Sequence, residues 1–379
     1  MRRLGFNPTR RVSFHYDLLR GGAFYARLRA DEGTAPHVRM QDNAQIKMSF
    51  SGVFGANAQD VDGGPMDVNW LTDEIQPVMN VNGIDYPLGV YIPTTQSVTD
   101  NVVRKVRIEA YDRCQRVLDT NSAVPVYWPR GTLYLDAVEQ LLSAAGVTTV
   151  FKTDTDAAFT EAREDWAAGT PFLTIVNDLL AEINYKGLFF DANGAAVLEP
   201  SSIPEAAQIA HTLDDADPET LVVPGITRQN DTFSAPNKFI VVCANPDKGE
   251  NMVAVSVNDN PQSPLSTVRR GREIVRVSTV DNISSQSELQ AYADRLRNDS
   301  LLTSETVSVT TGLLPGWGVA DVVALHTAPR AYIERTRRGK RLASVPGSND
   351  ICISRAYDME LKVGGKMQHT LEKVVYNLE

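Results

Sequence analysis

The sequence contains few of the features that mark disulfide-bonded, metal-binding or membrane-inserted proteins. Its three cysteines, Cys114, Cys243 and Cys352, are odd in number and far apart, and no Cys-x-x-Cys pair is present. Neither a zinc ribbon nor a redox pair is therefore indicated, and folding in a reducing compartment is expected. No run approaches the ~18 apolar residues of a membrane span, and the basic start lacks the apolar segment of a secretory signal. We expect no stable membrane insertion.

Positive charge is also in short supply. The chain has 37 Lys and Arg against 47 Asp and Glu, which gives a formal net charge of −10 at pH 7. Such a surface disfavours tight binding to a phosphate backbone, although it would suit a passage that DNA crosses without sticking. The 42% of hydrophobic residues is typical of a globular chain, and 379 residues predict two or three domains.

Patterns for catalysis and metal binding are missing as well. The histidines stand alone, with no pair at helical i, i+4 spacing: His15, His37, His211, His326 and His369. Cys114 follows an expected strand without a visible base, so we predict a buried, small apolar side chain.

The acidic stretch that begins at Asp154 starts like a calcium loop, but Ala158 and Phe159 stand where that loop needs an oxygen ligand and a glycine. Glu161 and Asp165 resemble a glycosidase pair only in composition, because nothing in the sequence brings them into a cleft. The glycines of residues 312–318 lack the Lys-Ser or Lys-Thr of a phosphate loop. We predict no enzyme, no cofactor, and no catalytic, cofactor-binding or metal-binding residues.

The residue pattern of the first third of the chain predicts β-structure. Alternating apolar residues at Ile46, Met48 and Phe50 predict a half-buried strand, and residues 102–111 predict another. An Asn-Gly pair at residues 82–83, between two apolar runs, predicts a hairpin.

The middle of the chain changes to helical periodicity. We expect one helix capped by Thr132 and ended by Gly146, and a second with Thr170 as its N-cap and Pro171 at its first position. A hairpin that turns at residues 191–194 follows the second helix. Strand-like runs then return from about residue 222, with one helix starting at a Ser-x-x-Glu capping box at residue 285.

These patterns predict a β-rich α+β protein in three parts. They are a first β-barrel-like domain (1–118), an α+β unit of two helices and a hairpin (119–212), and a second β-rich domain with one helix (213–379). The basic stretch from Arg330 to Arg341 lies between strands and is expected to be an exposed loop. Three roles stay open for this loop: it binds nucleic acid, it contacts an acidic neighbouring surface, or it remains solvated.

Six segments in order resemble the baseplate or distal-tail hub proteins of phages. They are residues 82–93 with Pro-Leu-Gly, the strand end at 108–113, the helix and hairpin of 170–200, the strand of 236–241 that begins with Pro-Asn, Asp259 to Arg272, and the helix of 287–302. A variant of a Gly-Asp-Val-Val motif follows at 318–323. The resemblance covers roughly residues 75–326.

The resemblance implies a non-enzymatic virion structural protein of the tail, baseplate or tail tip, made in the bacterial host cytoplasm. In that family two β-barrel-like tube domains per subunit form a pseudo-sixfold homotrimeric ring, with the α+β units outside. The implied partners are further copies of the chain, the tail tube or distal tail protein, the spike, fibre or tip protein, and the tape-measure protein. The resemblance also implies that DNA contacts the ring only while it passes through the lumen, during host cell entry and genome ejection. Two alternatives stay open, a tail-associated cell-wall hydrolase and a carbohydrate-binding tail-tip adhesin.

Overall fold

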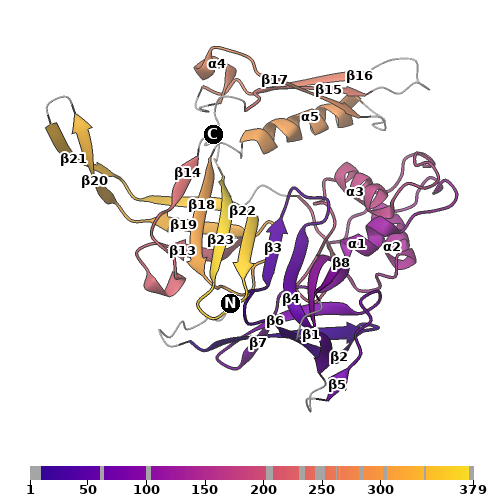
Figure 1. Ribbon diagram of the computed structural model, residues 1–379. Coiled ribbons are helices and arrows are strands. Elements are labelled where there is room, and N and C mark those ends of the chain that lie inside the picture. The colour runs from indigo at the N-terminus through magenta and orange to yellow at the C-terminus, as the bar shows by residue number, and fades with distance from the viewer. Residues whose placement is uncertain are drawn as a thin grey trace.

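The computed structural model describes residues 10–59, 64–99, 104–201, 208–229, 235–243, 252–261, 263, 265–280, 286–301, 305–336 and 339–374. Within these residues strands outnumber helices, as expected for the predicted β-rich α+β class. The strands form one 15-stranded sheet, two three-stranded sheets and one two-stranded hairpin (Figure 1).

The first part of the large sheet closes into a barrel. Hydrogen-bonded neighbours run in the order β1-β2-β4-β9-β8-β6 and return to β1. Closure pairs both edges of every strand in the ring, which removes exposed sheet edges. The bounds are β1 Val12–Arg20, β2 Ala23–Ala30, β4 Met48–Gln59, β6 Glu74–Val81, β8 Tyr91–Thr99 and β9 Lys105–Asp112, with short strands β5 Pro65–Met66 and β7 Ile84–Pro87 alongside.

Two sequence expectations in this barrel are confirmed. Asn82 and Gly83 both have positive φ, +54° and +87°, and form the tight turn between β6 and β7. In β9, Val106, Ile108 and Ala110 are buried while their neighbours are not, as predicted for a half-buried strand.

The second part of the large sheet stays open. Its order is β14-β18-β23-β22-β19-β13, and no pairing joins β13 to β14 within the described residues. The bounds are β13 Ile209–Asp214, β14 Thr227–Gln229, β18 Thr306–Gly312, β19 Val322–Thr327, β22 Ser348–Glu360 and β23 Lys366–Lys373, with the 3-10 helix η2 Pro218–Thr220 between β13 and β14.

Strand β3 (His37–Gln41) joins the two parts. It pairs with β4 of the barrel on one side and with β22 of the open sheet on the other. One hydrophobic core runs beneath both parts, from Phe50 and Tyr91 in the barrel to Val309 and Leu371 in the open sheet. The barrel and the open sheet are therefore one body.

The α+β unit packs around its own core at the side of the barrel. Its elements are α1 Cys114–Asp119, α2 Tyr134–Ala144, β10 Val150–Lys152, α3 Phe172–Glu182, β11 Phe189–Phe190 and β12 Ala196–Leu198. The predicted N-caps are wrong. The hydroxyls of Thr132 and Thr170 donate backwards, to the carbonyl oxygens of Pro129 (2.9 Å) and Ala167 (2.8 Å). The helices begin later, after Leu133 and Pro171.

A separate layer lies beyond the open sheet, at the top of Figure 1. Helix α5 (Gln286–Leu301) covers one face of a sheet in the order β16-β15-β17, burying Leu289 and Ala293 against Val241 and Cys243. The other elements are β15 Lys238–Cys243, β16 Met252–Val257, α4 Thr267–Arg270 and β17 Val275–Val280. The capping box predicted at residue 285 starts outside the described residues.

The basic stretch expected to be a loop is a β-hairpin. Strands β20 (Arg330–Thr336) and β21 (Gly339–Val345) pair in register along their whole length and project from the open sheet, at the left of Figure 1. We call this hairpin the arm. The loop prediction is wrong because the stretch connects β19 to β22, which are paired with each other. The arm continues this pairing outward as β20 and β21.

Candidate assembly surfaces

The side chains with catalytic potential lie in structural positions. Cys114, Cys243 and Cys352 are buried. The Sγ of Cys114 lies 3.7 Å from the carbonyl oxygen of Leu188, and burial raises the pKa of its thiol well above the usual value. A thiol held protonated in this way is a poor nucleophile.

The acidic stretch is built around an aromatic core. Phe159 is buried, with its ring centroid 4.5 Å from that of Tyr134 and 6.0 Å from that of Trp128. Glu161 is exposed, whereas Asp165 forms an ion pair with Arg163. Among the residues described, no group of three or more His, Cys, Asp and Glu is placed to hold a metal ion.

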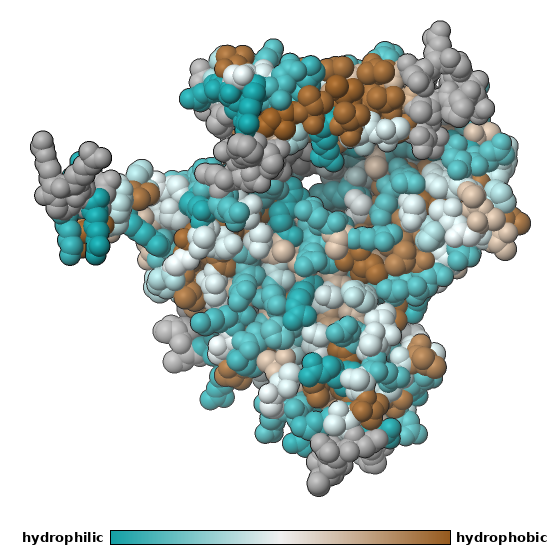
Figure 2. Space-filling model, turned by 45° about the horizontal axis from the view of Figure 1, so that its top comes forward, coloured by the Kyte–Doolittle hydropathy of each residue, from teal (hydrophilic) through white to brown (hydrophobic). Residues whose placement is uncertain are grey.

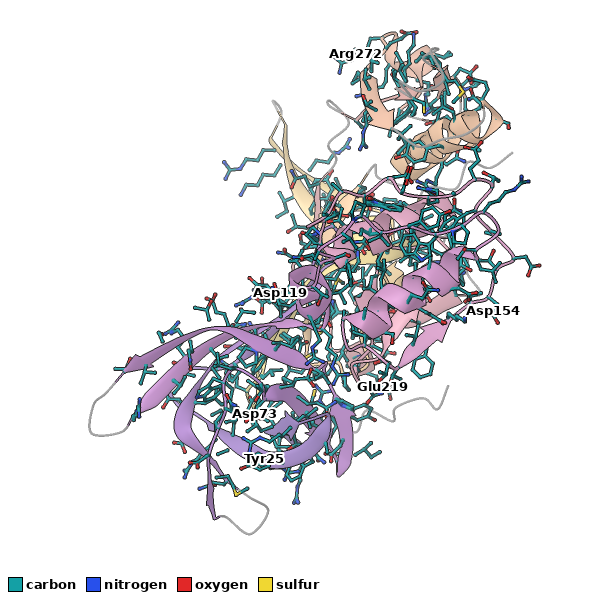
Figure 3. The ribbon with its side chains drawn as sticks, turned by 90° about the vertical axis from the view of Figure 1, so that its right-hand side faces the viewer. Tyr25, Asp73, Asp119, Asp154, Glu219 and Arg272 are labelled. Carbon is teal, nitrogen blue, oxygen red and sulfur yellow. The ribbon has the colours of Figure 1, made fainter. Side chains whose placement is uncertain are left out.

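Carboxylates elsewhere are also dispersed. Figure 3 shows Asp73, Asp119, Asp154 and Glu219 on separate parts of the molecule. Trp128, Trp166 and Trp317 are buried and Trp70 is half-buried, so these four rings do not form the exposed aromatic platform typical of a sugar-binding surface.

Three aromatic rings pack against one another in the open-sheet part of the molecule. The ring of Trp317 contacts both His211 and His369, whose ring centroids lie 4.2 and 4.3 Å from its own. Burial, with a smaller contribution from the charge of His211, lowers the pKa of His369 to about 3. Its Nε2 lies 2.9 Å from the Thr311 hydroxyl, and His211 Nε2 lies 3.0 Å from an Asp321 carboxylate oxygen. The other histidines lie near carboxylates: His15 near Asp17, His37 near Asp358 and His326 near Asp214.

Ion pairs fasten the seam between barrel and open sheet. Asp358 of β22 accepts hydrogen bonds from His37 Nδ1 (2.6 Å) and Arg39 Nε (2.8 Å) of β3. Burial opposes ionisation, but these bonds outweigh it and lower the pKa of Asp358. Arg355 adds bridges of 2.5 Å to Asp42 and to Glu372. The relative position of the two parts is thus fixed by charge as well as by sheet pairing.

A second set of contacts docks the α+β unit on the barrel. Glu74, 4% exposed, pairs with Arg113 (2.6 Å) and Arg116 (3.1 Å). Arg113 also donates to the carbonyl oxygen of Gly194 (2.7 Å). A Cβ on Gly194 would lie 2.9 Å from Val90, so this turn requires glycine for its close approach as well as for its φ of +78°.

Asp112, at the strand end that resembles the tail-hub motif, has a structural role. It accepts the backbone N–H groups of Cys114 (2.9 Å) and Met48 (3.2 Å). Burial raises the pKa of Asp112 to about 6, although these hydrogen bonds act in the opposite direction.

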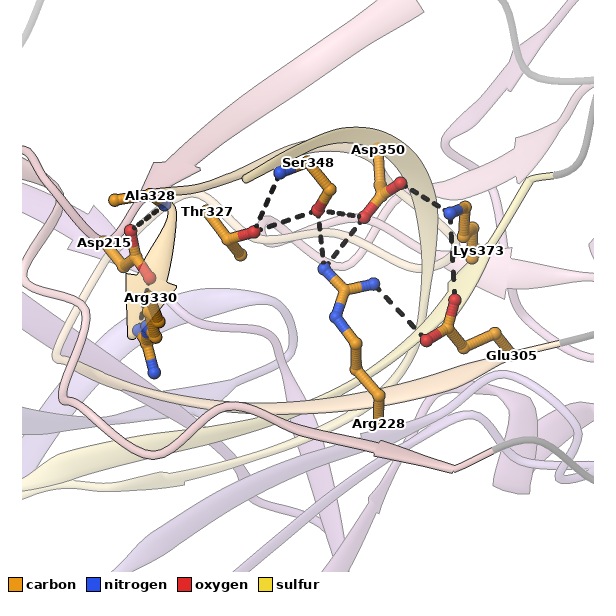
Figure 4. A network of polar contacts seen from close by, with 9 residues as sticks. All are labelled: Asp215, Arg228, Glu305, Thr327, Ala328, Arg330, Ser348, Asp350 and Lys373. Atoms are coloured by element: carbon orange, nitrogen blue, oxygen red, sulfur yellow. Dashed lines mark hydrogen bonds and ion pairs between the residues drawn. The ribbon is translucent and has the colours of Figure 1, made fainter. Parts of the chain in front are cut away.

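A polar network holds the base of the arm (Figure 4). Arg228 donates to Ser348 and Asp350, at 2.8 Å each, and Lys373 lies 2.7 Å from Asp350. On the other side, Asp215 accepts the backbone N–H of Ala328 (2.7 Å) and pairs with Arg330. The arm therefore leaves the open sheet from a fixed base. No sequence pattern indicated this network, in which Arg228 and Asp350 are 122 positions apart and Asp215 and Arg330 are 115 apart.

An apolar surface lies on the side of the β16-β15-β17 sheet away from α5. Val253 and Val255 of β16 and Val275 and Val277 of β17 are 44–62% exposed. Val255 and Val277 flank Ile240 of β15, Val253 pairs with Val242, and Val275 lies beside Lys238. Figure 2 shows an apolar area over this layer. Exposed patches of this kind mark contact sites in proteins that assemble.

No protein-family model and no curated protein matches the sequence, but solved structures share the fold. The tail protein from Neisseria meningitidis MC58 superposes with a TM-score of 0.64 at 13% identity, over 95% of this chain and 96% of that one. The 43 kDa tail protein of prophage MuSo2 from Shewanella oneidensis gives 0.62 at 12% identity, over 95% and 98%. The prophage tail protein gp18 from Listeria monocytogenes EGD-e gives 0.56 at 10% identity, over 94% of each chain.

The chain therefore has a phage tail-protein fold over almost its whole length. This agrees with the fold that the six sequence segments implied.

Proposed function

We propose that the protein is a structural tail hub, three copies of which form a ring that links the tail tube to the spike, fibre or tip. The observation that carries this proposal is the joining of a closed barrel and an open sheet through β3 into one body with one core. Three copies would present three closed barrels and three open sheets, which makes six β-rich parts. Such a ring matches a sixfold tube on one face and a threefold spike on the other.

The open sheet supports assembly by strand edges. Strands β13 and β14 each lack a partner on one side within the described residues, and unprotected edges are normally paired or covered. We propose that neighbouring copies, or the adjoining tube protein, cover them. The proposed units of the chain are residues 1–118, 119–212 and 213–379, with the α+β unit on the outside of the ring.

The charge of the chain supports a passive channel. A net charge of −10 would let DNA pass through the ring during genome ejection without being held. The further proposed partners are the distal tail and tape-measure proteins, and the proposed location is the virion tail after synthesis in the host cytoplasm. No helix within the described residues is long and apolar enough to cross a membrane.

We propose a non-enzymatic role. Cys114 and His369 are buried, and Glu161 and Asp165 lie on an exposed segment. None of them supports the hydrolase alternative. The buried tryptophans likewise give no support to the carbohydrate-binding alternative.

The test is the mass of the purified chain in solution, combined with negative-stain imaging. We expect a particle of three times 41.6 kDa with threefold symmetry and a central hole. A monomer at all concentrations, or cell-wall hydrolysis by the purified chain, would contradict the proposal.

A further inference from the structure

The arm has two different faces. Opposite residues of a hairpin lie on the same face, so Ile333 pairs with Leu342 and Arg335 with Lys340 on one of them. We call this face, completed by Ala331 and Ser344 nearer the base, the docking face. Tyr332 and Ala343 lie on the reverse face.

The docking face is costly to leave in water. Ile333 is 65% and Leu342 73% exposed, although they form a directly opposed aliphatic pair. Arg335 and Lys340, both exposed, place two like charges opposite one another, which destabilises an isolated hairpin. Two-stranded hairpins are marginally stable in water without further packing. A partner that covers the aliphatic pair and supplies carboxylates would remove both costs.

A surface that combines carboxylates with small side chains lies on the opposite side of the same chain. The solvent-facing side of helix α2 carries Asp136, Glu139, Gln140, Ser143 and Ala144, and Glu139 also forms an ion pair with Lys152 at 2.9 Å. The two carboxylates lie toward the start of the helix, and the small side chains lie toward its end. Figure 1 shows the arm and the α+β unit on opposite sides of the molecule, as a head-to-tail contact in a ring requires.

The spacing of the two surfaces also agrees. The basic pair and the aliphatic pair of the arm are two residues apart, or about 7 Å along a strand. Glu139 and Ser143 are four residues apart, or about 6 Å along a helix. Arg335 and Lys340 can therefore meet the carboxylates while Ile333 and Leu342 lie over Ser143 and Ala144.

We propose that the docking face of the arm binds the acidic, solvent-facing side of α2 in the next copy of this chain and so fastens neighbouring subunits. This proposal deepens the ring assignment and rests on it. The net charge of −10 favours a second copy over nucleic acid as the partner of a basic arm.

The first test places a photo-crosslinking benzoylphenylalanine at Ile333, with the same residue at Tyr332 on the reverse face as the matched control. We expect the Ile333 position to yield covalent dimers whose linked peptide includes residues 136–144, and the Tyr332 position to yield several-fold fewer. Crosslinks to another region, to another tail protein or to added DNA would overturn the proposal, as would equal yields from both positions.

The second test exchanges the charges. We expect R335E/K340E to weaken ring association about tenfold, measured by mass photometry over a dilution series. Adding D136K/E139K/K152E to that variant should restore association to about the wild-type value, because the attraction returns with its sign reversed and the pair between positions 139 and 152 is kept. Circular dichroism confirms that each variant is folded.

The outcomes separate the two proposals. A wild-type ring that R335E/K340E leaves unchanged would overturn the arm contact and leave the hub assignment standing. A wild-type chain that stays monomeric and gives no crosslinked dimer would overturn both.

Discussion

The closed barrel and the open sheet differ in how their strand edges are paired. In the barrel, pairing of β4 with β9 leaves each of the six ring strands bonded on both sides. In the open sheet, β13 and β14 each have one edge that no described residue pairs with, and the arm extends beyond the fold. The barrel is thus complete within one chain, whereas the open sheet concentrates the features that another chain would complete. Assembly properties can therefore reside in one half of a molecule whose two halves share a core.

The shared core predicts that both halves unfold together, which is the largest effect we expect. Phe50, 1% exposed and stacked on Tyr91 at 5.5 Å, belongs to the barrel, and Leu371, fully buried, belongs to the open sheet. Phe50→Ala should cost about 3–5 kcal/mol and Leu371→Ala about 2–5 kcal/mol. Both changes should lower the midpoint of one thermal transition in calorimetry.

Phe24→Ala is the matched control, because Phe24 lies on a barrel strand but is 45% exposed, and it should change stability by about 0.5 kcal/mol or less. Two separate transitions, each responding to only one of the buried substitutions, would show that barrel and open sheet fold independently.

The buried histidine predicts that the open sheet responds to acid. The pKa of His369 is lowered to about 3, and that of an unfolded histidine is about 6.5. Between these values the unfolded chain binds a proton that the folded chain excludes, so stability falls as the pH falls. From pH 7 to pH 5 the wild type should lose about 2 kcal/mol more than His369→Gln.

Chemical denaturation at several pH values measures this difference. His326→Gln is the control, since His326 lies in the same sheet with its side chain 42% exposed, and this variant should keep the acid-induced loss that His369 causes. Identical acid sensitivity of wild type and His369→Gln would refute the assignment.

The seam predicts the smallest effect. Despite burial, hydrogen bonds from His37 and Arg39 lower the pKa of Asp358, so its contribution is present above about pH 4 and is lost as the pH falls through the lowered pKa. Asp358→Asn should cost about 1 kcal/mol at pH 7, because the site is partly exposed. The difference from wild type should shrink in acid.

Asp85→Asn serves as the comparison for the seam, since Asp85 is exposed and its neighbour Asn80 can still donate to an amide oxygen. If both substitutions have the same effect at pH 7, the ion pairs of β3 and β22 do not stabilise the seam.

Local signals determined much of the fold. Alternation at Val106, Ile108 and Ala110 was sufficient to predict a half-buried strand, and the Asn82-Gly83 turn follows from the positive φ that both residues tolerate. Helix ends were less predictable. Thr132 and Thr170 have the right chemistry for N-caps, but their hydroxyls bond to preceding carbonyls instead.

The sequence by itself determined the β-rich class, the order of the elements and the acidic balance, because these depend on short-range periodicity and composition. Only the tertiary structure decided that β3 joins β22, that β4 closes the barrel with β9, and that residues 330–345 form an arm rather than a loop. Those pairings connect residues far apart in the chain, and whether a basic stretch becomes a hairpin depends on whether the strands beside it are paired.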